Sequence, residues 1–217
     1  MGKKICIIQT GTASSEELMT LCAEMMPEVS AYQIIDDSLL KEISGVGGLT
    51  PSVNRRMYAY CMQAQEMGAD AILHHCVAAA DVVGFVQPFL DIPVIRIDEG
   101  MAHQAVRAGR RIAVFGTSKL AMKNSVRLLK RVAAEEKRQI DITGEHLLED
   151  ARNTVRQEAE MAGLESDAIV LAQPSMTALL PLLEGIGTPI FDPVRSGIGY
   201  LKMRLEGTVP QGGERRR

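Results

Sequence analysis

The chain has 217 residues, of which 46% are hydrophobic, so it is long and apolar enough to bury a substantial core as one domain or as two smaller lobes. Aromatic residues make up only 4%, which predicts an aliphatic core of the kind found in parallel sheets covered by helices. The net charge of −3 argues against a general nucleic-acid binder. No apolar run has transmembrane length and no signal peptide is visible, so we expect a cytoplasmic protein without membrane association.

The cysteines bear on metal binding and on the redox environment. They show neither a CxxC pair nor zinc-ribbon spacing, which predicts reduced thiols and no structural metal site. The four residues are Cys6, Cys22, Cys61 and Cys76.

Strands and helices alternate through the first half of the chain, which predicts a parallel sheet. Residues 36–50 are expected to form a loop or a short helix, and Pro51 opens the helix that follows. The expected strands are Lys4–Gln9, Ala31–Ile35, Asp70–Cys76 and Ile92–Ile97, and the expected helices run from Ser15 to about Met26, Pro51–Met67, Ala79–Leu90 and Asp98–Ala108.

The second half repeats the first in the same order. Its expected helices are Ala121–Lys137 and Leu147–Met161. Three apolar segments match, namely Arg111–Thr117 with Lys4–Thr10, Asp167–Gln173 with Asp70–Cys76, and Thr188–Phe191 with Ile92–Ile95. We therefore predict an α/β protein of two pseudo-symmetric lobes, each a four-stranded parallel sheet flanked by helices, with the site in the inter-lobe cleft. Residues 1–98 and 196–217 are assigned to the first lobe, and residues 99–195 to the second.

The end of the predicted strand at 70–76 is the most informative stretch of the sequence. Burying His74, His75 and Cys76 costs free energy, so we expect them to have a role there. Strand alternation would place His74 and Cys76 on one face and His75 on the other. Ligands of open α/β sheets bind beyond the carboxyl ends of the strands. A cysteine there, at a helix N-terminus, tends toward the reactive thiolate. The alternative is a buried, inert cysteine beside two hydrogen-bonded histidines.

His74 has two interpretations. It is a candidate partner for Cys76, either as positive charge or as an acid, or it packs beneath the cysteine and bonds to the backbone. A metal site made of His74, His75 and Cys76 is disfavoured, because adjacent strand residues point to opposite faces and no further ligands lie nearby.

The chain resembles the aspartate/glutamate/hydantoin racemase superfamily from about Lys4 to Arg195. Four features in order carry the resemblance: Thr10-Gly11-Thr12 after the first strand, Cys76 followed by small residues, the Pro93 segment running into Ile112–Thr117, and the strand ending at Gln173. The resemblance implies a cofactor-independent mechanism in which one thiolate removes the proton next to a carboxylate and a second thiol protonates the opposite face. It also implies a small carboxylate substrate and a homodimer or higher homo-oligomer.

By this resemblance Cys76 corresponds to the first cysteine. The residues expected to hold the substrate are small, hydroxyl-bearing or rich in backbone donors, which suits a carboxylate and an enediolate. They are Thr10, Gly11, Thr12, Val77, Ala78, Gly116, Thr117, Ser118, Pro174 and Ser175.

The sequence departs from the family pattern at Gln173, which stands where the second cysteine is expected. Glutamine cannot exchange a proton with carbon, although its amide can donate to an oxyanion. Glu145 and His146, predicted just after a strand at Asp141–Thr143, are either replacements for the lost thiol or an ordinary loop end. Three functions stay open: a racemase or isomerase using Cys76 as acid/base, a one-cysteine decarboxylase or lyase, and a non-catalytic small-molecule binder.

Overall fold

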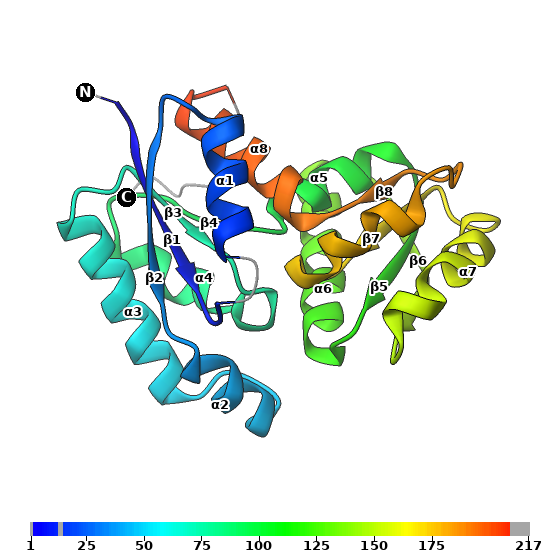
Figure 1. The fold of residues 1–217 in the computed structure, drawn as a ribbon, viewed down its shortest axis with the longest axis horizontal. Coiled ribbons are helices and arrows are strands. Elements are labelled where there is room, and N and C mark those ends of the chain that lie inside the picture. Colours follow the sequence, from blue (N-terminus) through cyan, green and yellow to red (C-terminus); the bar gives the residue numbers. More distant parts are fainter. Residues whose placement is uncertain (1, 13–14, 209–217) are drawn as a thin grey trace.

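The computed structural model describes residues 2–12 and 15–208. Two four-stranded parallel sheets follow one another along the chain, with strand orders β2-β1-β3-β4 and β6-β5-β7-β8 (Figure 1). The predicted fold of two similar lobes is thereby confirmed. The strands are β1 (Lys4–Gln9), β2 (Ser30–Ile35), β3 (Ala71–His74), β4 (Val94–Arg96), β5 (Arg111–Gly116), β6 (Asp141–Leu147), β7 (Ala168–Leu171) and β8 (Ile190–Phe191).

Strand alternation divides the first lobe into two cores. Ile5 and Ile7 of β1 face the side covered by α1 (Ser15–Met25) and α8 (Pro193–Leu205). Cys6 and Ile8 face the other side, covered by α2 (Ser38–Val46), α3 (Pro51–Glu66) and α4 (Val82–Val86). Every other side chain of a strand shares a face, so one short strand supplies apolar groups to both layers.

The second lobe is built in the same way. Ile112 and Val114 of β5 pack with α5 (Glu99–Ala108) and α6 (Lys119–Glu135). Ala113 and Phe115 pack with α7 (Ala151–Gly163) and the 3₁₀ segment η3 (Pro174–Leu183).

The chain crosses between the lobes twice, from β4 into α5 and from β8 into α8. The C-terminal helix α8 returns to the core of the first lobe, where Ile198 and Leu201 are fully buried. The assignment of residues 1–98 and 196–217 to one lobe and 99–195 to the other stays a prediction. Residues 209–217 lie outside the described residues.

Several elements differ from the sequence prediction. Strand β3 ends at His74 instead of Cys76, and the helix expected over 79–90 is replaced by the short segments η1 (Val77–Ala79), α4 and η2 (Gln87–Phe89). Pro88 lies in the first turn of η2, and because it has no N–H it cannot continue the hydrogen bonding of α4. Helix α7 begins at Ala151, four residues later than expected, because β6 continues through Leu147.

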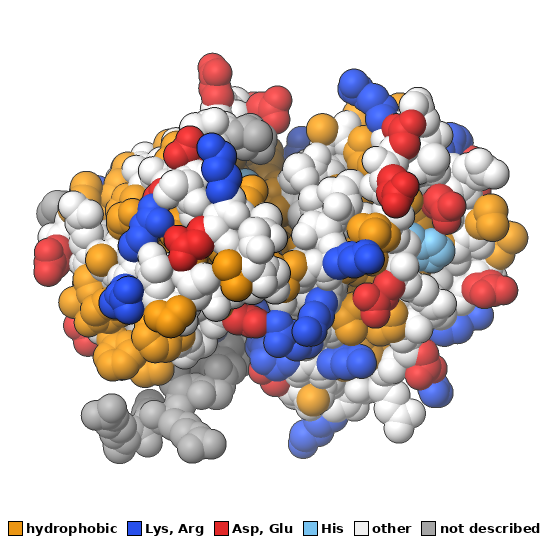
Figure 2. Space-filling model, turned by 90° about the horizontal axis from the view of Figure 1, so that it is seen from below, with side chains coloured by type: hydrophobic (Ala, Val, Ile, Leu, Met, Phe, Trp, Pro, Cys, Tyr) orange, Lys and Arg blue, Asp and Glu red, His pale blue; other side chains and the backbone are white. Residues whose placement is uncertain are grey.

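On the face drawn in Figure 2 the two lobes meet along a furrow, and Lys and Arg side chains gather at one end of it. Within residues 2–12 and 15–208, no helix has the length and apolar character needed to cross a bilayer.

Candidate active site

A cavity of about 470 Å³ lies between the lobes, beyond the carboxyl ends of β1, β3, β5 and β7. Small ligands of open α/β sheets bind at this edge, so the cavity is the candidate site. Nine residues predicted to form the site line it: Thr10, Gly11, Cys76, Val77, Ala78, Ser118, Gln173, Pro174 and Ser175.

Cys76 lies two residues beyond β3, at the start of η1, and is only 9% exposed. Burial raises the pKa of its thiol above the ordinary value, while hydrogen bonds from the Thr10 hydroxyl and from the N–H groups of Ala79 and Ala78 oppose that rise. The Asp98 carboxylate raises the pKa further. The expectation of a thiolate in the free protein is therefore wrong, because η1 is a single turn whose donors do not outweigh desolvation.

The two histidines exchange the places expected from strand alternation. His74 is 1% exposed and does not line the cavity, whereas His75 does. Because β3 ends at His74, the alternating pattern no longer governs the residues that follow. His74 is thus a buried core residue and no cavity-lining partner for Cys76.

Both imidazoles are uncharged at neutral pH. Burial lowers the pKa of His74 to about 3, helped by the positive charge of Arg96, and burial lowers that of His75 to about 4. Neither ring nitrogen of His74, nor Nε2 of His75, has a hydrogen-bond partner among the described residues. His75 therefore lines the cavity with a neutral ring whose Nε2 is buried and has no hydrogen-bond partner among the described residues.

Gln173 stands two residues beyond β7, as Cys76 stands two beyond β3. Its amide nitrogen donates to Thr117 Oγ1 at 2.7 Å and to Ser175 Oγ at 3.2 Å, and its amide oxygen accepts from Thr117 N at 3.2 Å. Both of its N–H groups are thereby engaged. A hydroxyl that accepts such a bond keeps its own proton for another acceptor, so Ser175 can donate into the cavity.

Three residues predicted to bind substrate do not line the cavity. Gly116 is buried, and a Cβ added there would lie 2.3 Å from Met122 Cγ, so this glycine serves packing. Thr117 contacts Gln173 instead, and Thr12 is exposed beside residues 13–14.

Glu145 and His146 belong to strand β6 and do not follow its end. His146 Nδ1 lies 3.2 Å from Glu158 Oε2, and its ring packs against Phe115 with centroids 4.5 Å apart. Since neither residue lines the cavity, neither takes the place of the second thiol there.

The cavity also contains residues that the sequence did not single out. Strand alternation predicts that His75 points away from the site, yet it lines the cavity. Lys119 could have been predicted from its position, because it directly follows the Gly-Thr-Ser segment 116–118. Helix α2 covers one side with Leu40, Ser44 and Gly47. Nothing in the local sequence of 36–50 indicates that this helix folds over the site.

A second cavity, of about 570 Å³, adjoins the first and shares His75, Pro174 and Ser175 with it. Its remaining wall comes from the exposed face of α1, with Glu16 and Glu17, and from Arg195 of α8. No group of three His, Cys, Asp or Glu side chains is arranged to hold a metal ion in the part of the chain that is described.

The sequence model of the Asp/Glu/Hydantoin racemase family matches residues 7–201. The chain belongs to this family. Known structures of similar fold include allantoin racemase from Klebsiella pneumoniae, at 17% identity and a TM-score of 0.68 over 100% of this chain and 97% of that one. Glutamate racemase from Thermus thermophilus aligns at 16% identity and a TM-score of 0.64, covering 98% of this chain and 84% of that one.

A mutant of arylmalonate decarboxylase also has this fold, at 17% identity and a TM-score of 0.61 over 97% of this chain and 96% of that one. A search of curated protein sequences found no match. At these identities the structural matches show a shared fold, and family membership rests on the sequence model. Proteins of this fold therefore include both racemases and a decarboxylase.

Proposed function

We propose that the protein is a cofactor-independent enzyme that transfers a proton at the carbon next to the carboxylate of a small acid, with Cys76 as the acid/base. The observation that carries this is the place of Cys76, a thiol at the wall of the inter-lobe cavity that accepts hydrogen bonds from Thr10, Ala78 and Ala79. The other three cysteines are buried in the first lobe's cores, where burial raises the pKa of each to about 11 or 12.

In the isomerase or racemase reaction, the thiolate of Cys76 takes the proton from the α-carbon, and the electron pair of the broken C–H bond moves onto the carboxylate to give an enediolate. Because the thiol is protonated in the free protein, its proton must first pass to water before the thiolate can take the proton from carbon. The enediolate requires donors in a water-poor site. Ser118 and Ser175 supply hydroxyl groups, and Lys119 supplies positive charge from the N-terminus of α6.

Decarboxylation is the second candidate, and two observations favour it. Loss of CO₂ leaves an electron pair on carbon that needs only one proton, and the raised pKa keeps Cys76 protonated and ready to give it. Gln173, on the facing lobe, has no proton acidic enough to be given to the other face of the carbanion. The two candidates share Cys76 and differ in whether the C–H bond or the bond to CO₂ breaks first.

One experiment separates the candidates. The wild-type protein is incubated in D₂O with aspartate, glutamate, hydantoin, allantoin and an arylmalonate, and both deuterium in recovered substrate and CO₂ release are measured. Deuterium at the α-carbon without CO₂ identifies an isomerase or racemase, and CO₂ with one deuterium in the product identifies a decarboxylase. If neither occurs while one of these compounds slows alkylation of Cys76, the enzyme proposal is wrong and the cavity belongs to a binding protein.

A further inference from the structure

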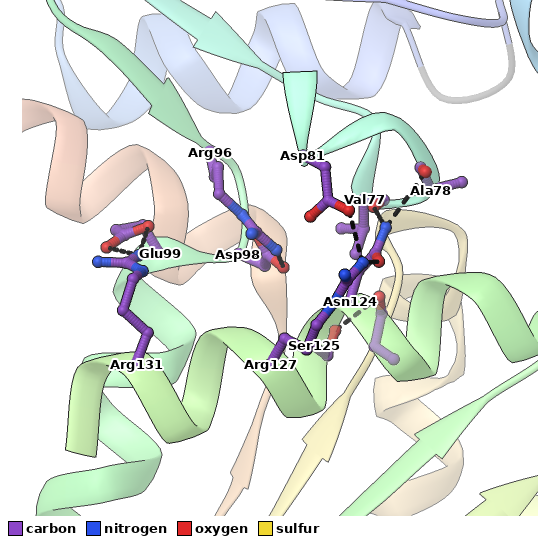
Figure 3. A network of polar contacts seen from close by, with 11 residues as sticks. Val77, Ala78, Asp81, Arg96, Asp98, Glu99, Asn124, Ser125, Arg127 and Arg131 are labelled. Atoms are coloured by element: carbon purple, nitrogen blue, oxygen red, sulfur yellow. Dashed lines mark hydrogen bonds and ion pairs between the residues drawn. The ribbon is translucent and has the colours of Figure 1, made fainter. Parts of the chain in front are cut away.

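Asn124 of α6 reaches from the second lobe into the turn that follows Cys76 in the first. Its side chain is 1% exposed, and Nδ2 donates to the carbonyl oxygens of Val77 at 2.9 Å and Ala78 at 3.2 Å (Figure 3). A buried amide of one lobe thus pairs with two backbone carbonyls of the other. The Val77 carbonyl also accepts from Ala80 N at 3.1 Å within the turn, so Asn124 adds a second donor to it from the other lobe.

The orientation of this amide is itself fixed. Arg127 Nη2 donates to Asn124 Oδ1 at 2.5 Å and to the Asp81 carboxylate at 2.5 Å. Arginine has no acceptor, so the atom of Asn124 that faces it must be oxygen, and the N–H₂ group must face the carbonyls. Asp81 directly precedes α4, so the same network holds the turn at both ends (Figure 3).

The two carbonyls belong to the same peptide groups as the two N–H groups beside Cys76. The Val77 carbonyl and the Ala78 N–H form one planar unit, and the Ala78 carbonyl and the Ala79 N–H form the next. In a trans peptide the carbonyl and the N–H point in opposite directions. Asn124 therefore holds the outer ends of the two peptide planes whose N–H groups lie on the Cys76 side, where Ala79 N also donates to the Cys76 carbonyl at 3.2 Å and both N–H groups lower the pKa of the thiol.

We propose that Asn124 is a positioning residue, which keeps these two peptide groups turned so that their N–H groups face the sulfur of Cys76. Through this contact the second lobe adjusts the reactivity of a thiol that belongs to the first. The role of that thiol in turnover rests on the proposed function, but its reactivity can be measured without any substrate.

Other groups also act on Cys76. The Thr10 hydroxyl acts from the end of β1 and the Asp98 carboxylate from the start of α5, while His75 and Lys119 line the same cavity. Asp98 is itself paired with Arg96 at 2.7 and 2.9 Å. The side-chain hydrogen bonds of Asn124 go instead to Val77, Ala78 and Arg127, so replacing it leaves these other groups in place.

The test is the pH dependence of iodoacetamide alkylation of Cys76, followed by mass spectrometry of its peptide in the wild type and in Asn124→Leu. The leucine is of similar size but cannot donate, so the two peptide groups lose their contact with the second lobe and keep only the turn's own hydrogen bonds, Ala79 N to the Cys76 carbonyl and Ala80 N to the Val77 carbonyl. We expect the apparent pKa of Cys76 to rise by about one unit and labelling at pH 7 to fall about tenfold, with the same limiting rate at high pH.

Ser125→Ala is the matched control. Ser125 is fully buried on the same helix, and its hydroxyl donates to the Ala172 carbonyl at 3.3 Å, within the second lobe. Its removal should leave the alkylation profile unchanged. An unchanged profile in folded Asn124→Leu overturns the proposal, and so does an equal shift in Ser125→Ala, which would point to a general loosening of α6.

Arg127→Met provides a second variant in case Asn124→Leu does not fold. It leaves the donor of Asn124 in place but removes the group that orients it, so the pKa of Cys76 should rise by a smaller amount. No shift in a folded Arg127→Met then overturns the proposal. If the pKa of Cys76 shifts in the variants but the wild type turns over no small acid, the positioning role is supported and the proposed function is contradicted. If the wild type turns over a small acid but the pKa does not shift, the proposed function is supported and the positioning role is contradicted.

Discussion

At the scale of single residues, the two ends of the pseudo-symmetric site differ in chemistry. Cys76 and Gln173 each lie two residues beyond the central strand of their lobe and both line the cavity. The thiol can exchange a proton, whereas the amide can only hydrogen-bond, and its N–H groups are engaged by Thr117 and Ser175. Of these two groups, only the Cys76 thiol of the first lobe has a proton that it could exchange with carbon.

Restoring a thiol on the second lobe tests this asymmetry. We expect Gln173→Cys to racemise a chiral acid that the wild type only isomerises or decarboxylates, because a second acid/base then reaches the opposite face of the carbanion. Gln173→Ser is the control, since it makes the same gap without a proton donor of suitable pKa. Chiral chromatography of the products is the measurement. Equal behaviour of the two variants would show that position 173 does not face the reacting carbon.

The sequence predicted Cys76 and Gln173 as cavity residues but assigned the histidines wrongly. The error has a local cause, because apolar patterning does not mark where β3 ends, and a strand two residues shorter changes which histidine lines the cavity. The sequence also could not predict the protonation state of Cys76, because that state depends on how deeply the folded protein buries the thiol.

At the scale of elements, the two lobes are joined where helices α5 and α8 pack closely. A Cβ at Gly197 of α8 would lie 2.0 Å from the carbonyl oxygen of Ile97, and a Cβ at Gly100 of α5 would lie 2.1 Å from that of Ser196. Both neighbours are backbone atoms that cannot rotate away. Glycine is required at these two positions because the backbones approach each other closely at the crossing between lobes.

Gly197→Ala should therefore lower the free energy of unfolding by about 1–3 kcal/mol, as overpacking in a tight contact does. Gly199→Ala on the same helix is the matched control, because its added Cβ would meet only Met25 Cε, at 3.8 Å. That variant should be neutral or slightly more stable, since alanine favours a helix. Urea unfolding of both variants decides the matter, and equal stability would contradict the close-packed crossing.

The central strands were predicted well because buried parallel strands are continuous apolar runs, as in Ile5–Ile8 and Ala168–Leu171. Edge elements were predicted less well. Strand β6 lies at the edge of its sheet, beside β5, and carries alternating exposed and partly buried residues, so its polar second half has the composition of a loop. For helix α2 the sequence does not decide between a loop and a helix, because three glycines fall in its region.

At the scale of the whole molecule, stability should depend on pH through the buried histidines. His74 takes up a proton only near pH 3 in the folded state but near 6.5 when unfolded. As the pH falls below 6.5, the unfolded state binds protons that the folded state does not, so the folded state loses stability down to the folded pKa.

Between pH 7 and pH 5 this one residue should cost up to about 2 kcal/mol of unfolding free energy. Urea unfolding of the wild type and of His74→Leu at the two pH values measures it. The variant should lose less stability on acidification than the wild type. Parallel losses in the two proteins would show that His74 is not held neutral by the fold.

The oligomeric state stays a prediction at this scale. The family resemblance favours a homodimer or a higher homo-oligomer, and sedimentation velocity at micromolar concentration should show a single species of at least twice the 23.6 kDa chain mass. A monomer at that concentration would contradict it.

The central claim is that the inter-lobe cavity transfers protons to carbon through Cys76, and α-carbon deuterium exchange in D₂O by Cys76→Ala tests it most directly. A group that acts as a general acid or base contributes about 10²–10⁴-fold. With an acid that the wild type turns over, Cys76→Ala should lose deuterium incorporation by at least that factor, and Cys76→Ser nearly as much. Full incorporation by Cys76→Ala, in a protein as stable as the wild type, would contradict the account.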